Sequence, residues 1–396
     1  MSNTILTPDM ITDEALRVLH QKLNFVGNIS REYDDSFANQ GAKIGNTLRI
    51  RKPIEHTVGT GATMATGTGA DTTETSVTLT VNSQKHVPMR FSSNEMTMKI
   101  DDFSERHIQP AMARLAASIE SEVLADVVPD IPNAISAGTK VEMADILNGR
   151  KILVDNLAGA DRCACLDTQA NVDLVDSLKG LFQDSTQISK QYREGMMGRT
   201  ASFDFYENTL LPSHTTGAEG GLSNYLTNKA TAQTGASLIV DTGTKTIKAG
   251  DVFTIADVYD VHPETKTSTG ELKQFVVLAD ATGAGTLTIS PAIIASGPYQ
   301  NVSNAAANNK ALTFIGAAST AYKQSLLFDK GFATFATADL VLPENVHMAS
   351  RRVYDGISMR MVSDYSIVKD VFYTRIDVLY GWKILRDSLA TRVLHT

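Results

Sequence analysis

The segment VGTGATMATGTGADTTETS, residues 58–76, is rich in glycine and threonine and offers few side chains that a core could use. On each side of it apolar and polar residues alternate, in NTLRIRKP (46–53) and in SVTLTVNSQKHVPMRFS (76–92). Alternation with a period of two is typical of half-buried β-strands. The residues that share the apolar face are Leu48, Ile50, Val77, Leu79 and Val81. Together the segments predict a long hairpin whose tip exceeds the roughly 12–15 residues beyond which an unstructured loop is unusual.

A long amphipathic helix is expected after the hairpin, in IQPAMARLAASIESEVLADVV (108–128). Its apolar residues recur every three or four positions, as they do on the buried face of a helix. These residues are Met112, Leu115, Ala116, Ile119, Val123 and Val127. Pro110 suits the first helical turn, where its missing N–H is not needed.

Three shorter helices are predicted from the same kind of spacing. They cover residues 12–23, 141–157 and 168–182. A hydroxyl side chain just before an apolar periodic run can cap the first turn of a helix. Thr12 and Thr168 are therefore expected to be N-caps of the first and the last of these helices.

The two cysteines, Cys163 and Cys165, lie in the buried-strand pattern RCACLD (162–167). Residues two apart on a strand point to the same face, so these thiols are not placed to form a disulfide with each other. A zinc site would need further ligands in spaced pairs, and the nearest histidine, His214, stands alone. The pattern favours two free cysteines in a core, as in a protein from a reducing compartment.

The composition changes between residues 219 and 318, where Gly, Thr, Ala, Asn and Val are frequent and helical patterns are nearly absent. Short β-type runs separated by turn residues predict a small β-barrel or sandwich there. The runs are ASLIVD, DVFTIADV, KQFVVLAD, GTLTIS and ALTFIG. Strands are predicted before this region in 198–212 and after it in 356–365 and 372–385. The β-rich region is therefore expected to be an insertion.

The last predicted strand, FYTRIDVLYGWKIL (372–385), has two different faces. Ile376, Val378 and Tyr380 share one face. Arg375 and Asp377 share the other. This alternation predicts an apolar side toward a core and a charged side away from it.

The bulk composition narrows the class of protein. The chain has 396 residues, of which 42% are hydrophobic and 20% charged, as expected for a globular protein of two or three domains. The formal net charge is −8 and no Lys/Arg cluster is present. Tight, sequence-specific DNA binding needs clustered cations and is therefore not expected. Neither a signal-peptide pattern nor an apolar run of about 18 residues is found, so we expect no membrane association.

No motif points to catalysis, a cofactor or a metal. The glycine-rich segment lacks the lysine of a Walker loop, and Met64 stands where the third glycine of a dinucleotide fingerprint belongs. The eight histidines are scattered and no G-x-S-x-G motif occurs. Calcium binding in the β-rich region stays an alternative, although the acidic residues there form no D-x-D-x-D-G loop. These residues are Asp241, Asp251, Asp257 and Asp260. We expect a protein that is not an enzyme and that has no cofactor.

The order of these elements resembles the major capsid (coat) protein of tailed bacteriophages, in the family with an inserted telokin-like domain. The resemblance covers nearly the whole chain and lies in ANQGAKIGNTLRIRKP, VPMRFSSNEMTMKIDDFSERHIQPAMARLAASIESEVL, GRTASFDFYENTLLPSHTTG, KAGDVFTIADVYDVHPETK and TRIDVLYGWKILRDSLATRVL. It implies an α+β fold of the kind shared by tailed phages and herpesviruses. Its expected parts are an N-arm, an E-loop hairpin, a long spine helix, peripheral and axial domains, and an inserted small β-barrel domain.

The resemblance also implies a division of the chain. The expected parts are the N-terminal arm (1–40), the E-loop hairpin (41–95), the peripheral domain with the spine helix (96–140), the first part of the axial domain (141–218), the inserted β-barrel (219–318) and the C-terminal axial and peripheral part (319–396). In this scheme the glycine-rich tip lacks a core of its own because it orders on a neighbouring subunit. The ordering entropy is then lost only on docking, which keeps each contact weak.

Two groups of residues are candidates for contacts between subunits. The hairpin group consists of Arg49, Arg51, Gly59, Gly61, Met64, Gly67, Gly69 and Asp71. The second group is in a loop of the inserted region, residues 258–273, which in relatives can reach a neighbour across a two-fold contact. It consists of His262, Glu264 and Lys266.

The resemblance implies a shell of pentamers and hexamers of one subunit around double-stranded DNA that is held without sequence specificity. The expected partners are other copies of the chain, a scaffolding protein and a portal protein. The expected location is the virion capsid, assembled in the host cytoplasm. The alternatives are a virion decoration or tail structural protein and the shell protein of a cellular nanocompartment.

Overall fold

A computed structural model describes residues 8–31, 47–56, 74–92, 107–177, 199–354, 356–369 and 371–396. The fold is mixed α+β, as the sequence predicts, and divides into two compact units. The first unit consists of Met1–Arg51, Ser76–Val123 and Ala333–Leu385. The second consists of Lys52–Thr75, Leu124–Phe332 and Arg386–Thr396. None of the helices in the described ranges has the length and apolarity needed to span a bilayer.

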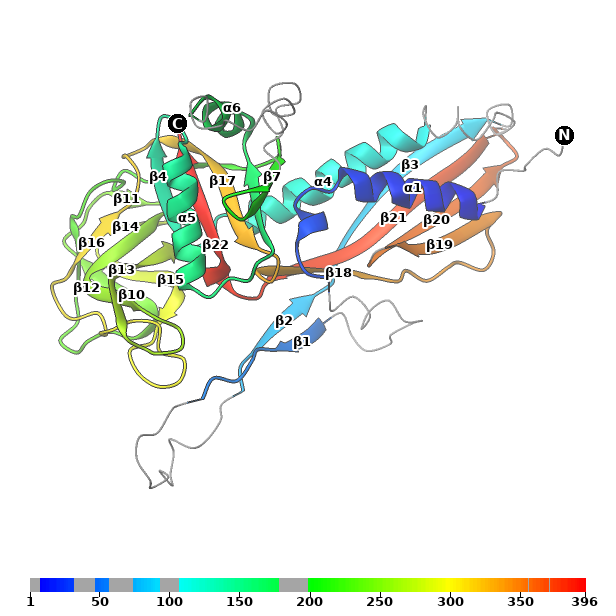
Figure 1. Ribbon diagram of the computed structural model, residues 1–396. Helices are drawn as coiled ribbons and strands as arrows, with labels where there is room; N and C mark the ends of the chain where they lie inside the picture. Colours follow the sequence, from blue (N-terminus) through cyan, green and yellow to red (C-terminus); the bar gives the residue numbers. More distant parts are fainter. Residues whose placement is uncertain are drawn as a thin grey trace. The chain divides into compact units, whose positions relative to one another are not determined.

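A five-stranded antiparallel sheet forms most of the first unit (Figure 1). β21 is central: it pairs with β3, with β20 and, through its last residues, with β18, and β19 extends the sheet beyond β20. The strands are β3 (Ser83–Ser92), β18 (Ala333–Ala338), β19 (Met348–Tyr354), β20 (Ile357–Ser366) and β21 (Val371–Ile384). Ile376, Val378 and Tyr380 are fully buried, which confirms the apolar face predicted for β21.

Two helices pack against this sheet, α1 (Pro8–Lys22) and α4 (Gln109–Val127). The six apolar residues predicted for the long helix are all buried in α4. Tyr380 donates a hydrogen bond to Glu122 at 2.8 Å, which ties α4 to β21. The carboxylate of Glu120 accepts hydrogen bonds from the backbone of Asn24 (2.9 Å) and Phe25 (2.8 Å), just before the 3₁₀ turn η1 (Val26–Asn28).

The N-cap predicted at Thr12 is wrong. α1 begins at Pro8, and Thr12 lies inside the helix with no exposed surface. A proline is tolerated in the first helical turn because its N–H would have no partner there. The hydroxyl at position 12 is therefore on the packed face of the helix rather than at its start.

The predicted hairpin is confirmed in its stem. β1 (Thr47–Arg51) and β2 (Ser76–Thr80) pair antiparallel, from Thr47 opposite Thr80 to Arg51 opposite Ser76. The run predicted at 76–92 is two strands, because β3 leaves the hairpin and pairs with β21. Gly381 of β21 lies close to the backbone where β2 ends. A Cβ at this position would overlap with the carbonyl of Thr80.

A second sheet, of seven strands, belongs to the second unit. Its order is β4-β22-β17-β5-β7-β6, with β8 paired to β17. The strands are β4 (Ala134–Gly138), β5 (Arg162–Leu166), β6 (Arg199–Thr200), β7 (Phe203–Glu207), β8 (Ser213–Thr215), β17 (Ala321–Asp329) and β22 (Ala390–His395). The strand predicted at 198–212 is interrupted because Ala201 and Ser202 form a turn with positive φ (52° and 67°). A 3₁₀ turn, η4 (Asp387–Leu389), precedes β22.

Helices α5 (Met143–Asp155) and α6 (Thr168–Ser177) also belong to the second unit. Thr168 is the first helical residue of α6 and not its N-cap. Instead, the carboxylate of Asp167 accepts the backbone N–H of Gln169 at 3.0 Å, the bond that an N-cap side chain makes. Cys163 and Cys165 are buried and form no disulfide with each other, as predicted, and burial raises the pKa of the Cys163 thiol to about 11.

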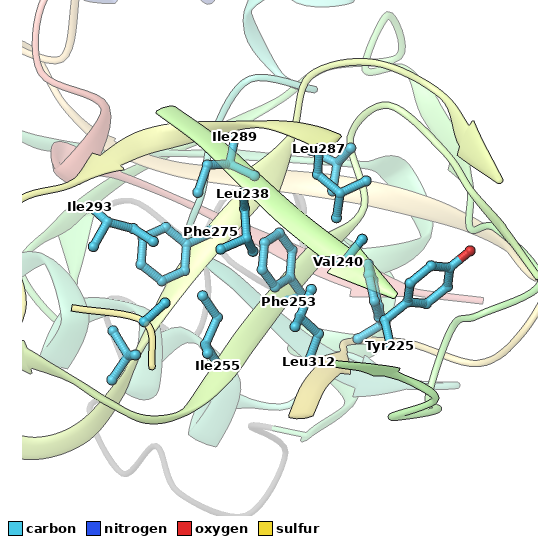
Figure 2. Close-up of a cluster of buried hydrophobic side chains, with 14 of the residues drawn as sticks. Tyr225, Leu238, Val240, Phe253, Ile255, Phe275, Leu287, Ile289, Ile293 and Leu312 are labelled. Carbon is cyan, nitrogen blue, oxygen red and sulfur yellow. The ribbon is translucent and has the colours of Figure 1, made fainter. Parts of the chain in front are cut away.

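The β-rich region forms a closed barrel, which confirms the predicted small β-barrel. The strand order is β10-β15-β13-β12-β16-β9. The strands are β9 (Tyr225–Thr227), β10 (Gly235–Asp241), β12 (Val252–Val261), β13 (Ser268–Val277), β15 (Gly285–Ile293) and β16 (Ala311–Phe314). A short pair, β11 (Thr246–Ile247) and β14 (Ala281–Thr282), lies outside the barrel. Figure 2 shows Phe253 and Phe275 side by side among the aliphatic residues of the core.

The buried imidazole of His395, in the second sheet, is expected to make the stability of the protein depend on pH. His395, at the end of β22, has no exposed surface, and neither ring nitrogen has a hydrogen-bond partner in the described part of the chain. Its Nε2 lies 3.6 Å from Oδ2 of Asp167, an oxygen that also contacts Lys323 at 3.1 Å. Burial lowers the pKa of His395 below its ordinary value of 6.5, and the charge of Asp167 opposes this effect without cancelling it.

We therefore expect His395 to reduce stability in acid. Below about pH 6.5 the unfolded chain protonates this imidazole while the folded chain does not, so the free energy of unfolding decreases by at most about 1.4 kcal/mol per pH unit until the folded pKa is reached. Urea unfolding between about pH 8 and pH 5 should show a flatter dependence for His395→Leu than for wild type. The control is His86→Leu, whose ring is exposed on β3. Identical pH dependence in wild type and His395→Leu would contradict this assignment.

Candidate assembly surfaces

Two arginines lie on the outer face of the hairpin stem. Arg49 and Arg51 of β1 are exposed, while Ile50 between them is 4% exposed and packs with Leu79. Nε of Arg49 donates a hydrogen bond to Oγ of Ser76 at 2.7 Å. The alternation predicted from the sequence thus fixes which side of the stem is charged. The remaining hairpin candidates (Gly59, Gly61, Met64, Gly67, Gly69 and Asp71) lie outside the described residues.

The second group of candidates lies in the loop between β12 and β13. His262 closes this loop: its backbone N–H donates to the carbonyl of Thr267 at 2.9 Å, and its Nδ1 accepts the N–H groups of Glu264 (3.2 Å) and Thr265 (3.3 Å). The ring therefore serves as an acceptor for the backbone of its own loop. His262 therefore organises the loop, and the Glu264 residue is exposed at its outer end.

Lys266, in the same loop, has a partner within the second unit. Its Nζ lies 2.7 Å from Oε2 of Glu55 and 3.4 Å from the carbonyl oxygen of Gln300. Its backbone has a positive φ of 54°, which turns the chain sharply at this point. Sequence reasoning missed Glu55, and no local signal could have indicated a partner 211 positions away.

Exposed aliphatic residues that sequence reasoning also missed lie at two places in the first unit. Ile367 and Val368, in the turn between β20 and β21, are 85% and 93% exposed. Val341 is 76% exposed in the loop after β18, and this loop is held by hydrogen bonds from Arg360 to the carbonyl of Val341 (2.6 Å) and from Arg351 to that of Leu340 (3.4 Å). Contiguous exposed apolar patches mark interaction sites, and the adjacent Ile367 and Val368 are therefore a candidate contact surface.

The acidic residues of the barrel region do not converge on one point. Asp257 pairs with Lys310 at 2.5 Å and Asp260 with Lys273 at 3.0 Å, while Asp251 is buried and contacts His214 at 2.8 Å. Within the described ranges no group of three or more His, Cys, Asp or Glu residues could hold a metal ion. His214 is thus engaged with a carboxylate and not with the cysteines.

The architecture is that of a shell-forming coat protein: a hairpin stem with a charged face, a long helix on an antiparallel sheet, and an α/β unit into which a closed barrel is inserted. Residues 3–391 match the family model described as "P22 coat protein - gene protein 5". The chain therefore belongs to the P22 coat protein family and is a bacteriophage capsid shell protein.

Solved structures give similar but distant matches. The chain is 10% identical to a structure of Mycobacterium phage Che8, with 94% of this chain and 90% of that one covered and a TM-score of 0.47. It is 11% identical to the capsid structure of cyanophage P-SCSP1u, with 89% of this chain and 84% of that one covered and a TM-score of 0.43. It is 10% identical to the mature capsid of bacteriophage PhiM1, with 91% of this chain and 84% of that one covered and a TM-score of 0.43. A search of curated protein sequences finds no match.

Proposed function

We propose that this chain is a major capsid protein that assembles, as pentamers and hexamers, into an icosahedral shell around double-stranded DNA. The observation that carries the proposal is the family match over residues 3–391. The exposed aliphatic residues of the first unit support it, because Ile367 and Val368 would be covered in a self-associating protein. The role is structural, and we assign the chain no catalytic activity and no cofactor.

The proposed role of each part of the chain follows the resemblance to tailed-phage coat proteins. Residues 1–40 serve as an arm, 41–95 as the E-loop, 96–140 as the peripheral domain, 141–218 with 319–396 as the axial and remaining peripheral parts, and 219–318 as the inserted domain. The contacts between copies use the hairpin and the loop that carries His262, Glu264 and Lys266. The net charge of −8 supports a shell that encloses DNA without binding it tightly. Scaffolding and portal proteins complete the assembly, which takes place in the host cytoplasm.

Electron microscopy of the purified chain tests this proposal directly. Expressed with its scaffolding protein, the chain should form closed shells in which rings of five and six subunits are resolved. Many weak contacts that are closed by symmetry produce a stable particle even when each contact is weak. A chain that stays monomeric under all such conditions would contradict the proposal.

Deletion of residues 59–71 should separate folding from assembly. The segment is rich in Gly and Thr and offers few side chains that a core could use, so thermal unfolding of the variant should remain within about 1–2 °C of wild type. Shell formation should be lost, because the E-loop is proposed to lie on a neighbouring copy. Sedimentation measures assembly and calorimetry measures folding.

A matched control replaces residues 59–71 by a Gly/Ser linker of equal length. This variant keeps the reach of the loop but not its side chains, so it shows whether assembly depends on length or on sequence. Normal shells from the deletion variant would show that the segment takes no part in contacts between copies.

A further inference from the structure

The barrel meets the seven-stranded sheet at a buried carboxylate. Asp251 immediately precedes β12 and is 2% exposed. Its Oδ1 lies 2.8 Å from Nε2 of His214, on β8 of the sheet. Its Oδ2 accepts the backbone N–H groups of Gly217 (3.0 Å), in the segment that leads into the barrel, and of Lys248 (2.8 Å), in the barrel's own turn. The contact between the barrel and the seven-stranded sheet is called the seam below. The carboxylate of Asp251 thus accepts hydrogen bonds from both sides of the seam.

A buried cation lies on the sheet side of the same seam. Arg392 of β22 is 1% exposed and donates hydrogen bonds to the carbonyl of Gly250 (3.0 Å) and to Oε1 of Gln324 (3.1 Å). Its Nε has no acceptor in the described part of the chain. Burial lowers the pKa of Arg392 to about 10, and the negative charges of Asp251 and Asp130 counteract this effect. The nearby carboxylates therefore offset part of the cost of burying the guanidinium.

Two further contacts along the seam are neutral. The side-chain amide of Gln274, on β13 of the barrel, donates to the carbonyl of Ala134 (3.1 Å) and accepts its N–H (2.7 Å), as an added strand would. A small apolar cluster packs beside it: Ala134, Val252, Val276, Tyr322 and Leu394. Gly217 allows the close approach, since a Cβ there would lie 2.9 Å from Oδ2 of Asp251. Among these contacts only Asp251 and Arg392 carry buried charge.

We propose that Asp251 is an electrostatic latch between the inserted barrel and the seven-stranded sheet. While the carboxylate is charged, barrel and sheet open only together. When an amide replaces it, the donors of His214, Gly217 and Lys248 lose a charged acceptor and Arg392 loses one of its two compensating charges. The seam then opens locally while the barrel core and the sheet core stay folded. This inference does not depend on assembly and concerns the chain before it meets another copy.

Hydrogen exchange measured by mass spectrometry on the full-length monomer tests the latch. In Asp251→Asn, amides of the seam at Gly217, Lys248 and Gly250 should exchange between about fivefold and a hundredfold faster than in wild type. Peptides from the interior of β12 and β13 and from β5 should keep wild-type rates. Unchanged exchange at the seam, or equal acceleration throughout the chain, would overturn the proposal.

Asp280→Asn is the matched control. Asp280 accepts from Lys248 Nζ (3.0 Å) and from the backbone of Ala249 (2.8 Å), so it serves the same turn, but its side chain is 60% exposed. Its loss should leave exchange at the seam near the wild-type rate, because water replaces an exposed carboxylate. Acceleration equal to that of Asp251→Asn would show that burial of the charge is unimportant and would overturn the latch.

Two variants of His214 keep the proposal testable if Asp251→Asn does not fold. The amide of His214→Gln can still donate to the carboxylate, whereas His214→Leu cannot. We expect faster exchange at the seam in the leucine variant and near wild-type exchange in the glutamine variant. Equal exchange in the two variants would mean that the hydrogen bond to Asp251 does not hold the seam.

Discussion

Phe253→Ala is expected to lower the free energy of unfolding by about 3–5 kcal/mol, because a fully buried phenyl ring leaves a cavity that its neighbours cannot fill. Its ring centroid is 5.3 Å from that of Phe314 and 5.9 Å from that of Phe275, so the three rings form the centre of the barrel core. Figure 2 shows Leu238, Ile255 and Leu312 around the same ring. Urea denaturation followed by circular dichroism measures the loss.

The control for Phe253→Ala is Ile239→Ala on β10. Ile239 belongs to the same barrel but is 37% exposed, so its truncation removes less buried surface and should cost less than about 1 kcal/mol. If Phe253→Ala unfolds at the same urea concentration as Ile239→Ala, the ring is not part of a tightly packed core. The size of the difference reports how tightly the core around Phe253 is packed.

Local patterns of the sequence were sufficient to predict several elements of this fold, but not strands such as β4 and β19. The helix α4 and the hairpin stem were predicted because one apolar residue per helical turn, or every second residue of a strand, must face a core. The barrel strands were predicted for the same reason. The local pattern left a barrel and a sandwich open, because closure depends on pairs such as Phe253 opposite Phe314, and those pairs are far apart in the chain.

The N-caps failed for a different reason. Thr12 and Thr168 both precede apolar runs, and a hydroxyl before such a run is a correct local signal for a cap. The actual starts depend on residues further upstream, Pro8 for α1 and Asp167 for α6. A helix boundary is a competition between neighbouring candidates, and the packing of the first turn decides it.

The candidate contact surfaces were predictable only in part. Arg49 and Arg51 followed from the alternation of β1, and His262 and Lys266 were placed in a loop of the inserted region by the family resemblance. The pairing of Lys266 with Glu55 and the exposure of Ile367 and Val368 depend on tertiary structure. An exposed valine or isoleucine has the same local signature as a buried one, so only the fold can show that it lacks a covering element.

Asp377 gives the clearest departure from a local pattern. Alternation along β21 places it on the charged face with Arg375, yet it has no exposed surface. Its Oδ2 lies 2.7 Å from Nη2 of Arg360, the residue directly opposite on β20, and its Oδ1 lies 2.5 Å from Nε of Arg375. Arg351 of β19 is in turn directly opposite Arg360 and pairs with Asp339 at 3.4 Å. The carboxylate of Asp377 therefore lies between Arg360 and Arg375, two cations that would otherwise repel each other.

Removal of this carboxylate in Asp377→Ala is expected to lower the free energy of unfolding by about 3 kcal/mol. Breaking one side of a buried ion pair typically costs about 3–5 kcal/mol because the remaining charge is left uncompensated. The lower end applies here since the Arg375 side chain is 46% exposed and can be hydrated, whereas that of Arg360 is only 17% exposed. Thermal and urea unfolding of the full chain measure the loss. The control is Asp364→Ala, an exposed carboxylate of β20, with an effect within about 0.5 kcal/mol.

A double variant separates charge from packing at this position. In Asp377→Leu combined with Arg360→Met, both the carboxylate and its most buried cation are replaced by apolar groups of similar size. Such replacements of complete buried pairs are often neutral or stabilising, so the double variant should be more stable than Asp377→Leu alone. If instead both substitutions lower stability additively, Asp377 and Arg360 do not interact, and the buried carboxylate must be stabilised by Arg375 alone. If Asp377→Ala is as stable as wild type, water already screens both arginines and the ion pair contributes nothing to the sheet.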